Sequence, residues 1–244
     1  MKRHRDRGVE WFEADLPDTT VCFTTRRGGF SEPPRNSLNL GILTGDDRET
    51  VLRNRALMVS ALGIDGSRIR MGLQVHGSRI LEHDDYDQGR FLSPVDEPPE
   101  ADGHITSKPG LPLLVLGADC LPVAVKGPGG LAMLHCGWRG LSGPLVRDAV
   151  ARVDGEAAVI GPGIGPCCFE VGDEVRHAFA ELGEGIFDCR QCDLPAVARI
   201  RLESAGVDRI ETAGLCTHCA SGAFFSHRRD GGSTGRQAGI AWIR

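Results

Sequence analysis

The sequence predicts an α+β fold in which mixed, largely antiparallel β-sheets pack with a few helices. Segments of strand length outnumber segments with helical periodicity, and several neighbouring strands are joined by short glycine-rich turns, which favour antiparallel pairing. The regular strand–helix alternation of a doubly wound sheet is absent from the pattern. The length of 244 residues suits one catalytic domain, which we assign to residues 10–244 behind a flexible tail, residues 1–9.

The expected strands are short apolar runs bounded by glycine, proline or polar residues. In chain order they cover 21–25, 71–75, 113–116, 121–125, 131–135, 157–160, 209–214, 224–228 and 238–243. Three helices are expected. The first begins after Asp47, which can cap it, and ends at Gly63, and the others cover 171–183 and 194–205.

Composition excludes several classes of protein. With 41% hydrophobic and 25% charged residues, the chain is a folded soluble protein, and no apolar run approaches the roughly 20 residues of a membrane span. The basic start of the chain lacks the apolar segment of a signal peptide, so we expect a cytoplasmic protein with nine reduced cysteines. The net charge of −5 argues against nucleic-acid binding.

Residues 117–140, GADCLPVAVKGPGGLAMLHCGWRG, predict a β-hairpin around the turn at 126–130. Counting outward from this turn brings Cys120 opposite His135, with one residue of slack for a bulge. Cross-strand neighbours have Cβ atoms about 4.5–5.5 Å apart, so the thiol and the imidazole could share a proton or a metal. The polar cluster of Asp119, Trp138 and Arg139 beside them favours a functional site over a buried structural pair.

Two chemistries fit this pair. It could be a nucleophile with its base, or two ligands of a catalytic zinc that needs three protein ligands and one open position. His76, which follows an expected strand and precedes a glycine, is the candidate third ligand, and His104 is its main rival.

The other cysteines give a weaker signal. Two Cys-x-x-Cys pairs are spaced as in structural zinc sites, but incidental reduced thiols are the favoured interpretation; the pairs are Cys189 with Cys192 and Cys216 with Cys219. Cys167 and Cys168 are adjacent and are assigned to core or pocket lining, because neighbouring side chains do not easily point at one metal. Cys22 alternates with apolar residues and is assigned to the core.

Three glycine-rich segments could bind anions through backbone N–H groups: 24–31, 160–166 and 228–236. The middle one is interpreted as a turn. The other two carry arginine beside glycine, which suits phosphate or carboxylate recognition, and Arg26, Arg228 and Arg229 are the candidates for a phosphate subsite.

A series of motifs carries a resemblance that covers roughly residues 10–244. In order they are Thr25-Arg26-x-Gly-Gly-x-Ser31, Leu38-Asn39-Leu-Gly41, Gly45-Asp-Asp47, Gln74-Val-His76-Gly77, Ala101-Asp102, Ala118-Asp-Cys-Leu-Pro122, His135-x-Gly-Trp-Arg-Gly140, Ile160-Gly-Pro-x-Ile-Gly-Pro-Cys-Cys168, Cys216-Thr217 and Phe224-Phe-Ser-x-Arg-Arg-Asp-Gly231. On these residues the chain resembles the YfiH family, also called the laccase-domain or multicopper polyphenol oxidase family.

The resemblance implies a layered fold related to that of the cysteine-dependent deamidating toxin CNF, and a zinc held by His76, Cys120 and His135. It also implies phosphorolysis of adenosine, inosine, guanosine and methylthioadenosine, with adenosine deamination as a second activity. Within the motifs we assign substrate contacts to Arg26, Asn39, Gln74, Arg139, Arg228 and Arg229. Two residues depart from the family pattern: His227 replaces a common tyrosine, and Cys136 replaces a usual alanine.

The leading hypothesis is therefore a zinc-dependent purine nucleoside phosphorylase with adenosine deaminase activity, acting on purine nucleosides and phosphate as a monomer or weak homo-oligomer. One alternative is a Cys120–His135 hydrolase that edits peptidoglycan precursors. Another is a copper-dependent polyphenol oxidase (laccase), disfavoured because eight histidines cannot build multicopper clusters. The last is a non-catalytic nucleoside-binding protein.

Overall fold

The computed structural model describes residues 1–87, 89–95 and 97–244. Within these ranges, a five-stranded sheet has the order β1-β2-β3-β13-β6, with every neighbouring pair antiparallel. Its strands are β1 (Lys2–Asp6), β2 (Val9–Leu16), β3 (Thr19–Thr24), β13 (Gln237–Ile243) and β6 (Leu113–Gly117).

A six-stranded sheet within the same described ranges has the order β12-β9-β7-β8-β5-β4 and is parallel only at its two edge pairs. Its strands are β12 (Arg209–Thr212), β9 (Ala157–Ile160), β7 (Leu121–Gly127), β8 (Gly130–Cys136), β5 (Gly103–Thr106) and β4 (Ile80–Glu82). A small hairpin joins β10 (Phe187–Asp188) to β11 (Gln191–Cys192). The predicted α+β class with largely antiparallel sheets is confirmed.

The helices are short. The α-helices are α1 (Arg48–Leu62), α2 (Trp138–Ser142), α3 (Leu145–Val153), α4 (Asp173–Ala178) and α5 (Leu194–Ser204). The 3-10 turns are η1 (Ile42–Thr44), η2 (Gly66–Arg68), η3 (Ala180–Leu182) and η4 (Glu184–Ile186). No helix in the described part of the chain is long and apolar enough to cross a membrane.

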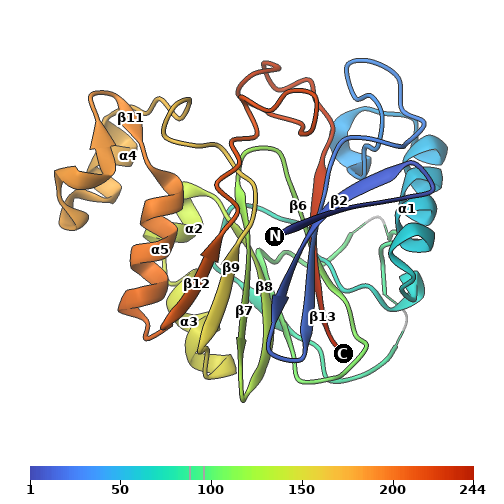
Figure 1. Ribbon diagram of the computed structural model, residues 1–244, viewed down its shortest axis with the longest axis horizontal. Coiled ribbons are helices and arrows are strands. Elements are labelled where there is room, and N and C mark those ends of the chain that lie inside the picture. The colour runs from blue at the N-terminus through green and yellow to red at the C-terminus, as the bar shows by residue number, and fades with distance from the viewer. Residues whose placement is uncertain (88, 96) are drawn as a thin grey trace.

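The elements stack in four layers (Figure 1). Between the two sheets lies one apolar cluster, which includes Phe23 of β3 and Met133 of β8. Met58 of α1 packs in a second cluster on the outer face of the five-stranded sheet. A third cluster joins α3 and α5 to the outer face of the six-stranded sheet, where Val150 and Val197 are buried. Because both sheets are covered on their outer faces, inner strands such as β8 and β9 appear in the sequence as nearly continuous apolar runs.

Most of the expected elements are present. In α1 the side chain of Asp47 accepts a hydrogen bond from the Thr50 N–H at 2.8 Å, and Gly63 ends the helix with φ of 65°. These are an N-cap and a left-handed C-cap, the signals on which the prediction depended. The second expected helix is shorter than predicted: α4 ends at Ala178, and η3 completes the path to Gly183.

The N-terminal segment differs from the predicted flexible tail. Residues 2–6 form β1 and pair with β2, and Arg3 forms an ion pair with the buried carboxylate of Glu10 at 2.5 Å. The terminal ammonium group of Met1 lies 2.8 Å from Glu211. A charged sequence is typical of an edge strand, which is why composition alone suggested a tail.

Two expected strands are absent from the described structure. Residues 71–75 make only an isolated bridge, between Leu73 and Glu100. In 224–228 the chain turns instead of extending, although Phe224 and Phe225 are both buried. In 224–228 the two phenylalanines are therefore buried without a β-ladder, whereas in 71–75 Met71 and Leu73 are only partly buried and Val75 is exposed.

Candidate functional site

The structure brings together the three residues proposed as metal ligands. Ligand atoms of His76, Cys120 and His135 all lie within 4.8 Å of one another, and the two imidazole rings are 5.0 Å apart at an interplanar angle of 68°. His135 belongs to β8, whereas Cys120 directly precedes β7. The rival ligand His104 lies elsewhere, fully buried in β5 and stacked on His83.

The hairpin register differs from the predicted one. Pro122, not Cys120, is the cross-strand partner of His135, so Cys120 lies beyond the end of the ladder. It reaches the imidazole because Asp119 adopts φ of 97°, a left-handed conformation that turns the chain. Both carboxylate oxygens of Asp119 are held, one by the Thr217 hydroxyl at 2.6 Å and one by the Arg228 N–H at 2.7 Å.

His76 is also left-handed, with φ of 61°. Such a conformation costs a non-glycine residue on the order of 1–3 kcal/mol and persists only where the surroundings enforce it. Here the enforcing group is the buried carboxylate of Asp102, which accepts the N–H groups of Val75, His76 and Gly77 at 2.7–3.1 Å. Asp102 thus fixes the loop that presents the His76 imidazole.

The same carboxylate orients the second imidazole. Asp102 lies 2.8 Å from Nδ1 of His135, and its own carbonyl oxygen accepts the His135 N–H at 2.7 Å. An imidazole held through Nδ1 by a carboxylate has Nε2 available for a metal, the arrangement found repeatedly behind metal-bound histidine. Asp102 appeared in the sequence only as part of a short Ala-Asp motif, and its role as an organiser was missed.

Electrostatic coupling in this group overcomes burial. Burial disfavours the imidazolium of His135, yet its neighbours Cys120 and Asp102 raise the pKa of His135 to about 9. Burial also disfavours the thiolate, yet His135 and His76 lower the pKa of Cys120 to about 6. The hydrogen bonds from His135 and the N–H groups of the His76 loop likewise lower the pKa of Asp102 despite its burial. Without a metal, the site therefore favours a Cys120 thiolate beside a His135 imidazolium at neutral pH.

The residues fit a metal ion. A Cβ atom on Gly137 would lie 3.0 Å from Cys120 Sγ and 3.3 Å from His76 Cδ2, so only glycine leaves the space among the ligand atoms open. One thiolate and two imidazoles are a donor set used by catalytic zinc, with one position left for water or substrate. The group can therefore hold a metal that remains accessible from the adjoining cavity.

That cavity has a volume of about 800 Å³ and is rich in arginine. Among the described lining residues, the arginines are Arg48, Arg55, Arg90, Arg139, Arg228 and Arg236, and the one acidic residue is Asp119. This is the reverse of the chain as a whole, whose net charge is −5. Since Asp119 is already hydrogen-bonded through both oxygens, the cavity presents a positive surface suited to an anion.

Three of the predicted substrate-binding residues line this cavity: Gln74, Arg139 and Arg228. The side-chain amide of Gln74 donates to the Leu116 carbonyl oxygen at 2.6 Å and accepts the Leu116 N–H at 2.7 Å. Both of its polar atoms are therefore bonded to the backbone, and Gln74 forms part of the cavity wall. Arg139 lies over the Trp138 ring, 4.3 Å from its centroid. Arg228 donates to the Glu170 carbonyl oxygen at 2.8 Å. The two arginines remain placed to meet a ligand.

The other three predicted contacts lie outside this cavity. Arg26 donates to the Asn36 carbonyl oxygen at 2.6 Å and borders a separate small pocket. Asn39 is buried, and its Oδ1 accepts the backbone N–H groups of Gly41 and Arg236. Arg229 donates to three backbone carbonyl groups and pairs with Asp230. These side chains hold loops together.

Sequence reasoning missed Arg236 as a cavity residue. Its pKa is lowered by burial, although the nearby Cys120 and Asp119 favour its charge. Because it ends the same glycine-rich segment that begins at Arg228, the signal was present in the sequence. Arg55 is buried too, donates to the carbonyl groups of Leu40 and Phe91, and has its pKa lowered to about 10 by burial.

Comparison with known proteins gives consistent matches over nearly the whole chain. The family described as "Multi-copper polyphenol oxidoreductase laccase" matches residues 20–244. "Purine nucleoside phosphorylase YfiH" of Shigella flexneri is 35% identical over 236 residues, which cover 91% of this chain and 93% of that protein. "Purine nucleoside phosphorylase" of Xylella fastidiosa (strain Temecula1) is 39% identical over 247 residues, 93% of each chain. The crystal structure of YlmD from Geobacillus stearothermophilus superposes with a TM-score of 0.90 at 31% identity, covering 99% and 98% of the two chains.

Proposed function

We propose that this chain, which belongs to the multi-copper polyphenol oxidoreductase laccase (YfiH) family, is a zinc-dependent purine nucleoside phosphorylase that also deaminates adenosine. The relatives named purine nucleoside phosphorylase match it over more than nine-tenths of their length, and the family match at residues 20–244 includes every described residue of the cavity lining. The observation that carries the proposal is the position of a three-ligand metal group at the wall of an arginine-lined cavity.

We assign zinc to this group, because thiolate and imidazole are both zinc ligands and a catalytic zinc site has three protein ligands. His76, Cys120 and His135 would hold it, and it would supply Lewis acidity to a substrate or water in the cavity. Among the described residues, the other candidate metal group consists of four cysteines, so the histidine-rich clusters of a multicopper oxidase are not assembled. This argues against phenol oxidation through several coppers.

The cavity residues divide the remaining work. Phosphorolysis needs a phosphate held beside the anomeric carbon C1′ of the nucleoside, where its oxygen forms a bond as the bond to the purine nitrogen breaks. Arg228 and Arg236 are the residues we assign to phosphate, because guanidinium groups bind phosphate in a bidentate way. Phe169 and Trp138 provide aromatic surface for the purine in the same cavity.

The test is an assay of zinc-loaded protein with inosine and inorganic phosphate. We expect release of hypoxanthine with ribose 1-phosphate in equal amounts, and no release when phosphate is omitted. With adenosine and no phosphate, we expect slow formation of inosine and ammonia. Absence of both base and deaminated product from fully loaded enzyme would refute the proposal.

A thiol hydrolase acting on peptidoglycan precursors remains the second candidate, because Cys120, His135 and Asp102 also resemble a nucleophile–base–carboxylate triad. The second imidazole, His76, lies beside the same thiol and suits a metal better than a triad. Chelation separates the two functions. A thiol hydrolase keeps its activity after zinc removal, whereas the zinc enzyme loses it and regains it on reloading.

A further inference from the structure

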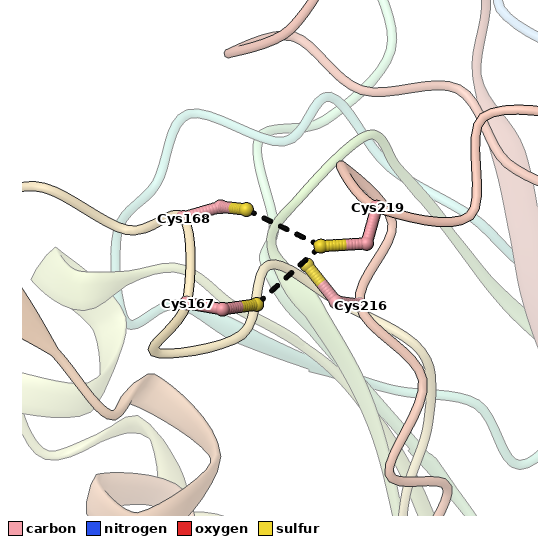
Figure 2. A group of neighbouring side chains, drawn as sticks. All are labelled: Cys167, Cys168, Cys216 and Cys219. Atoms are coloured by element: carbon pink, nitrogen blue, oxygen red, sulfur yellow. Dashed lines mark hydrogen bonds between the residues drawn. The ribbon is translucent and has the colours of Figure 1, made fainter.

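Four cysteine side chains, none of them part of the His76, Cys120 and His135 group, face one another. Figure 2 shows Cys167 and Cys168 on one turn directed toward Cys216 and Cys219 on another. The four sulfur atoms all lie within 4.8 Å of one another, and Cys219 Sγ lies 3.5 Å from Cys167 Sγ and 3.4 Å from Cys168 Sγ. The grouping differs from the predicted one, since Cys192 is buried in the core beside α5.

The first turn explains how adjacent cysteines can face the same point. The N–H groups of Cys168 and Phe169 both donate to the Gly165 carbonyl oxygen, at 3.0 and 3.1 Å. The chain therefore curls around Gly165 instead of extending, and successive side chains do not alternate as they would in a strand. The argument against a shared metal at Cys167 and Cys168 assumed an extended chain, and it does not apply to this turn.

The second turn aligns the other two thiols. The Ala220 N–H donates to the Cys216 carbonyl oxygen at 3.0 Å, which closes one helix-like turn. Residues three apart in such a turn lie on one side, so Cys216 and Cys219 face the same way. The turns are joined by the bridge between Gly163 and Cys216 and by the Thr217 N–H, which donates to the Gly163 carbonyl oxygen at 2.9 Å.

We propose that Cys167, Cys168, Cys216 and Cys219 bind a structural zinc ion as four thiolate ligands. Zinc–sulfur bonds of about 2.3 Å place the sulfur atoms of a tetrahedral site about 3.8 Å apart, close to the spacing seen in this group. The Gly165 N–H also donates to Cys216 Sγ at 3.3 Å, a contact that stabilises a thiolate. No carboxylate or imidazole of the described residues belongs to the group, which suits a closed structural site.

A zinc ion explains a feature that a disulfide would not. One sulfur, that of Cys219, approaches two others at nearly equal distance. In a disulfide Cys219 would bond to only one of these two sulfurs, whereas a cation draws all four sulfurs to a common centre. The ion would tie the segment after β12 to the segment after β9, and these two segments carry Arg228 and Phe169 to the cavity wall.

The decisive measurement is the zinc content of the reduced, purified protein after gel filtration. We expect about two equivalents per chain in the wild type, one for each group of ligands. The double variant Cys216→Ser, Cys219→Ser should retain about one equivalent, and so should the double variant His76→Ala, Cys120→Ala. The variant Cys189→Ser, which removes an exposed thiol outside the group, is the matched control and should keep both.

Cobalt substitution identifies the ligands independently of activity. In the variant His76→Ala, Cys120→Ala, the cobalt protein should keep intense thiolate-to-metal charge-transfer absorption, and the further change Cys167→Ser, Cys168→Ser should abolish it. One equivalent of zinc in the wild type that is retained in Cys216→Ser, Cys219→Ser overturns the proposal, as does a disulfide within the group in protein purified under reducing conditions. Loss of the second equivalent during gel filtration would show an adventitious ion only, and it would also overturn the proposal. Because zinc content is measured without substrate, the outcome is separate from that of the phosphorolysis assay.

Discussion

The molecule contains two pairs of neighbouring histidine rings that differ sharply in electrostatic character. His76 and His135 have ring centroids 5.0 Å apart, and His83 and His104 have them 5.3 Å apart, the latter pair joined by a ring–ring hydrogen bond of 3.1 Å. The pKa of His135 is raised to about 9, whereas burial lowers the pKa of His104 to about 3. Burial is complete or nearly so for both.

The difference lies in what surrounds the rings. The first pair has a thiol, Cys120, at its centre and the carboxylate of Asp102 behind it. The second pair has burial as its main influence, and His83 also feels the positive charge of Arg70. Two histidines that touch are therefore not in themselves a metal site. The anionic partners distinguish the first pair as the candidate metal site.

Removing the thiol should have the largest effect. In Cys120→Ala the first pair loses its anionic ligand and becomes similar to the second, so zinc should be lost from this site. Since changes behind the ligands alone cost 10–100-fold, we expect phosphorolysis to fall by more than about 100-fold. Steady-state assays with inosine and phosphate measure this. Cys136→Ala removes the neighbouring core thiol and should keep near-normal activity. Full activity in Cys120→Ala would show that the thiol is dispensable.

Removing the carboxylate should have the next largest effect. In Asp102→Asn the Nδ1 of His135 and three backbone N–H groups lose their anionic partner, so the affinity for zinc should fall about 10–100-fold. Competition titration against a chromogenic chelator gives the dissociation constant. Asp148→Asn, a change of the same kind on α3, is the control. Equal affinities in the two variants would contradict the role of Asp102 as a positioning residue.

A change in the cavity should alter phosphate binding without touching either pair. In Arg236→Gln one guanidinium leaves the cavity, and we expect the KM for phosphate to rise about tenfold, equivalent to about 1.4 kcal/mol. The KM for inosine should change little. Arg26→Gln removes the same charge outside the cavity and should leave both constants unchanged. A rise in both variants would mean that only overall charge matters.

Lowering the pH should destabilise the fold through the second pair, His83 and His104. Both rings stay neutral near pH 7, so we expect no effect of this pair on activity there. Because the folded-state pKa of His104, about 3, lies below the ordinary value of 6.5, the unfolded chain binds more protons below pH 6.5. Stability should therefore fall as the pH drops from 6.5 toward 3, by about 1.4 kcal/mol per pH unit for this proton. His83, with its pKa lowered to about 4 by burial, adds to the same slope.

Urea unfolding between pH 7 and pH 5 measures that slope. The variant His83→Gln, His104→Gln should show a shallower one than the wild type. Ring titration by NMR in the wild-type protein gives an independent check that does not depend on the variant folding. Protonation of either ring near pH 6.5 in the folded protein would contradict the assignment of a neutral pair.

The sequence was most informative where one local pattern dominates. The strands 157–160 and 121–125 were found because both faces of their sheet are covered, and α1 because Asp47 and Gly63 mark its ends. The sequence was least informative where an element depends on a packing or pairing partner that is not recognisable from the local pattern. The charged strand β1 pairs along its whole length with β2, a partner that its composition does not reveal, and the sequence reasoning missed α3 although one face of it is buried.

The candidate site also contains residues that a local sequence pattern predicts and residues that it does not. Cys120 and His135 both lie at the open end of one hairpin, one on each side of it. Their proximity therefore follows from a turn that can be recognised in the sequence. Asp102 acts through backbone N–H groups of a loop 25 to 27 residues away, and no spacing rule predicts such a contact. The four-cysteine group depends on two turns 51 or 52 residues apart, and local reasoning assigned its members to different roles.

The position of the ligands along the chain also sets an order of assembly during synthesis. His76, Asp102, Cys120 and His135 are all synthesised before any of residues 136–244. Thr217 and Arg228, which hold the carboxylate of Asp119, are synthesised near the end of the chain, and so are Cys216 and Cys219. The candidate metal ligands are therefore all synthesised before the residues that hold Asp119. A metal ion bound before residues 213–244 are made would therefore bind before the cavity is complete. These residues supply Arg228 and Arg236 to the cavity wall, and Cys216 and Cys219 to the four-cysteine group.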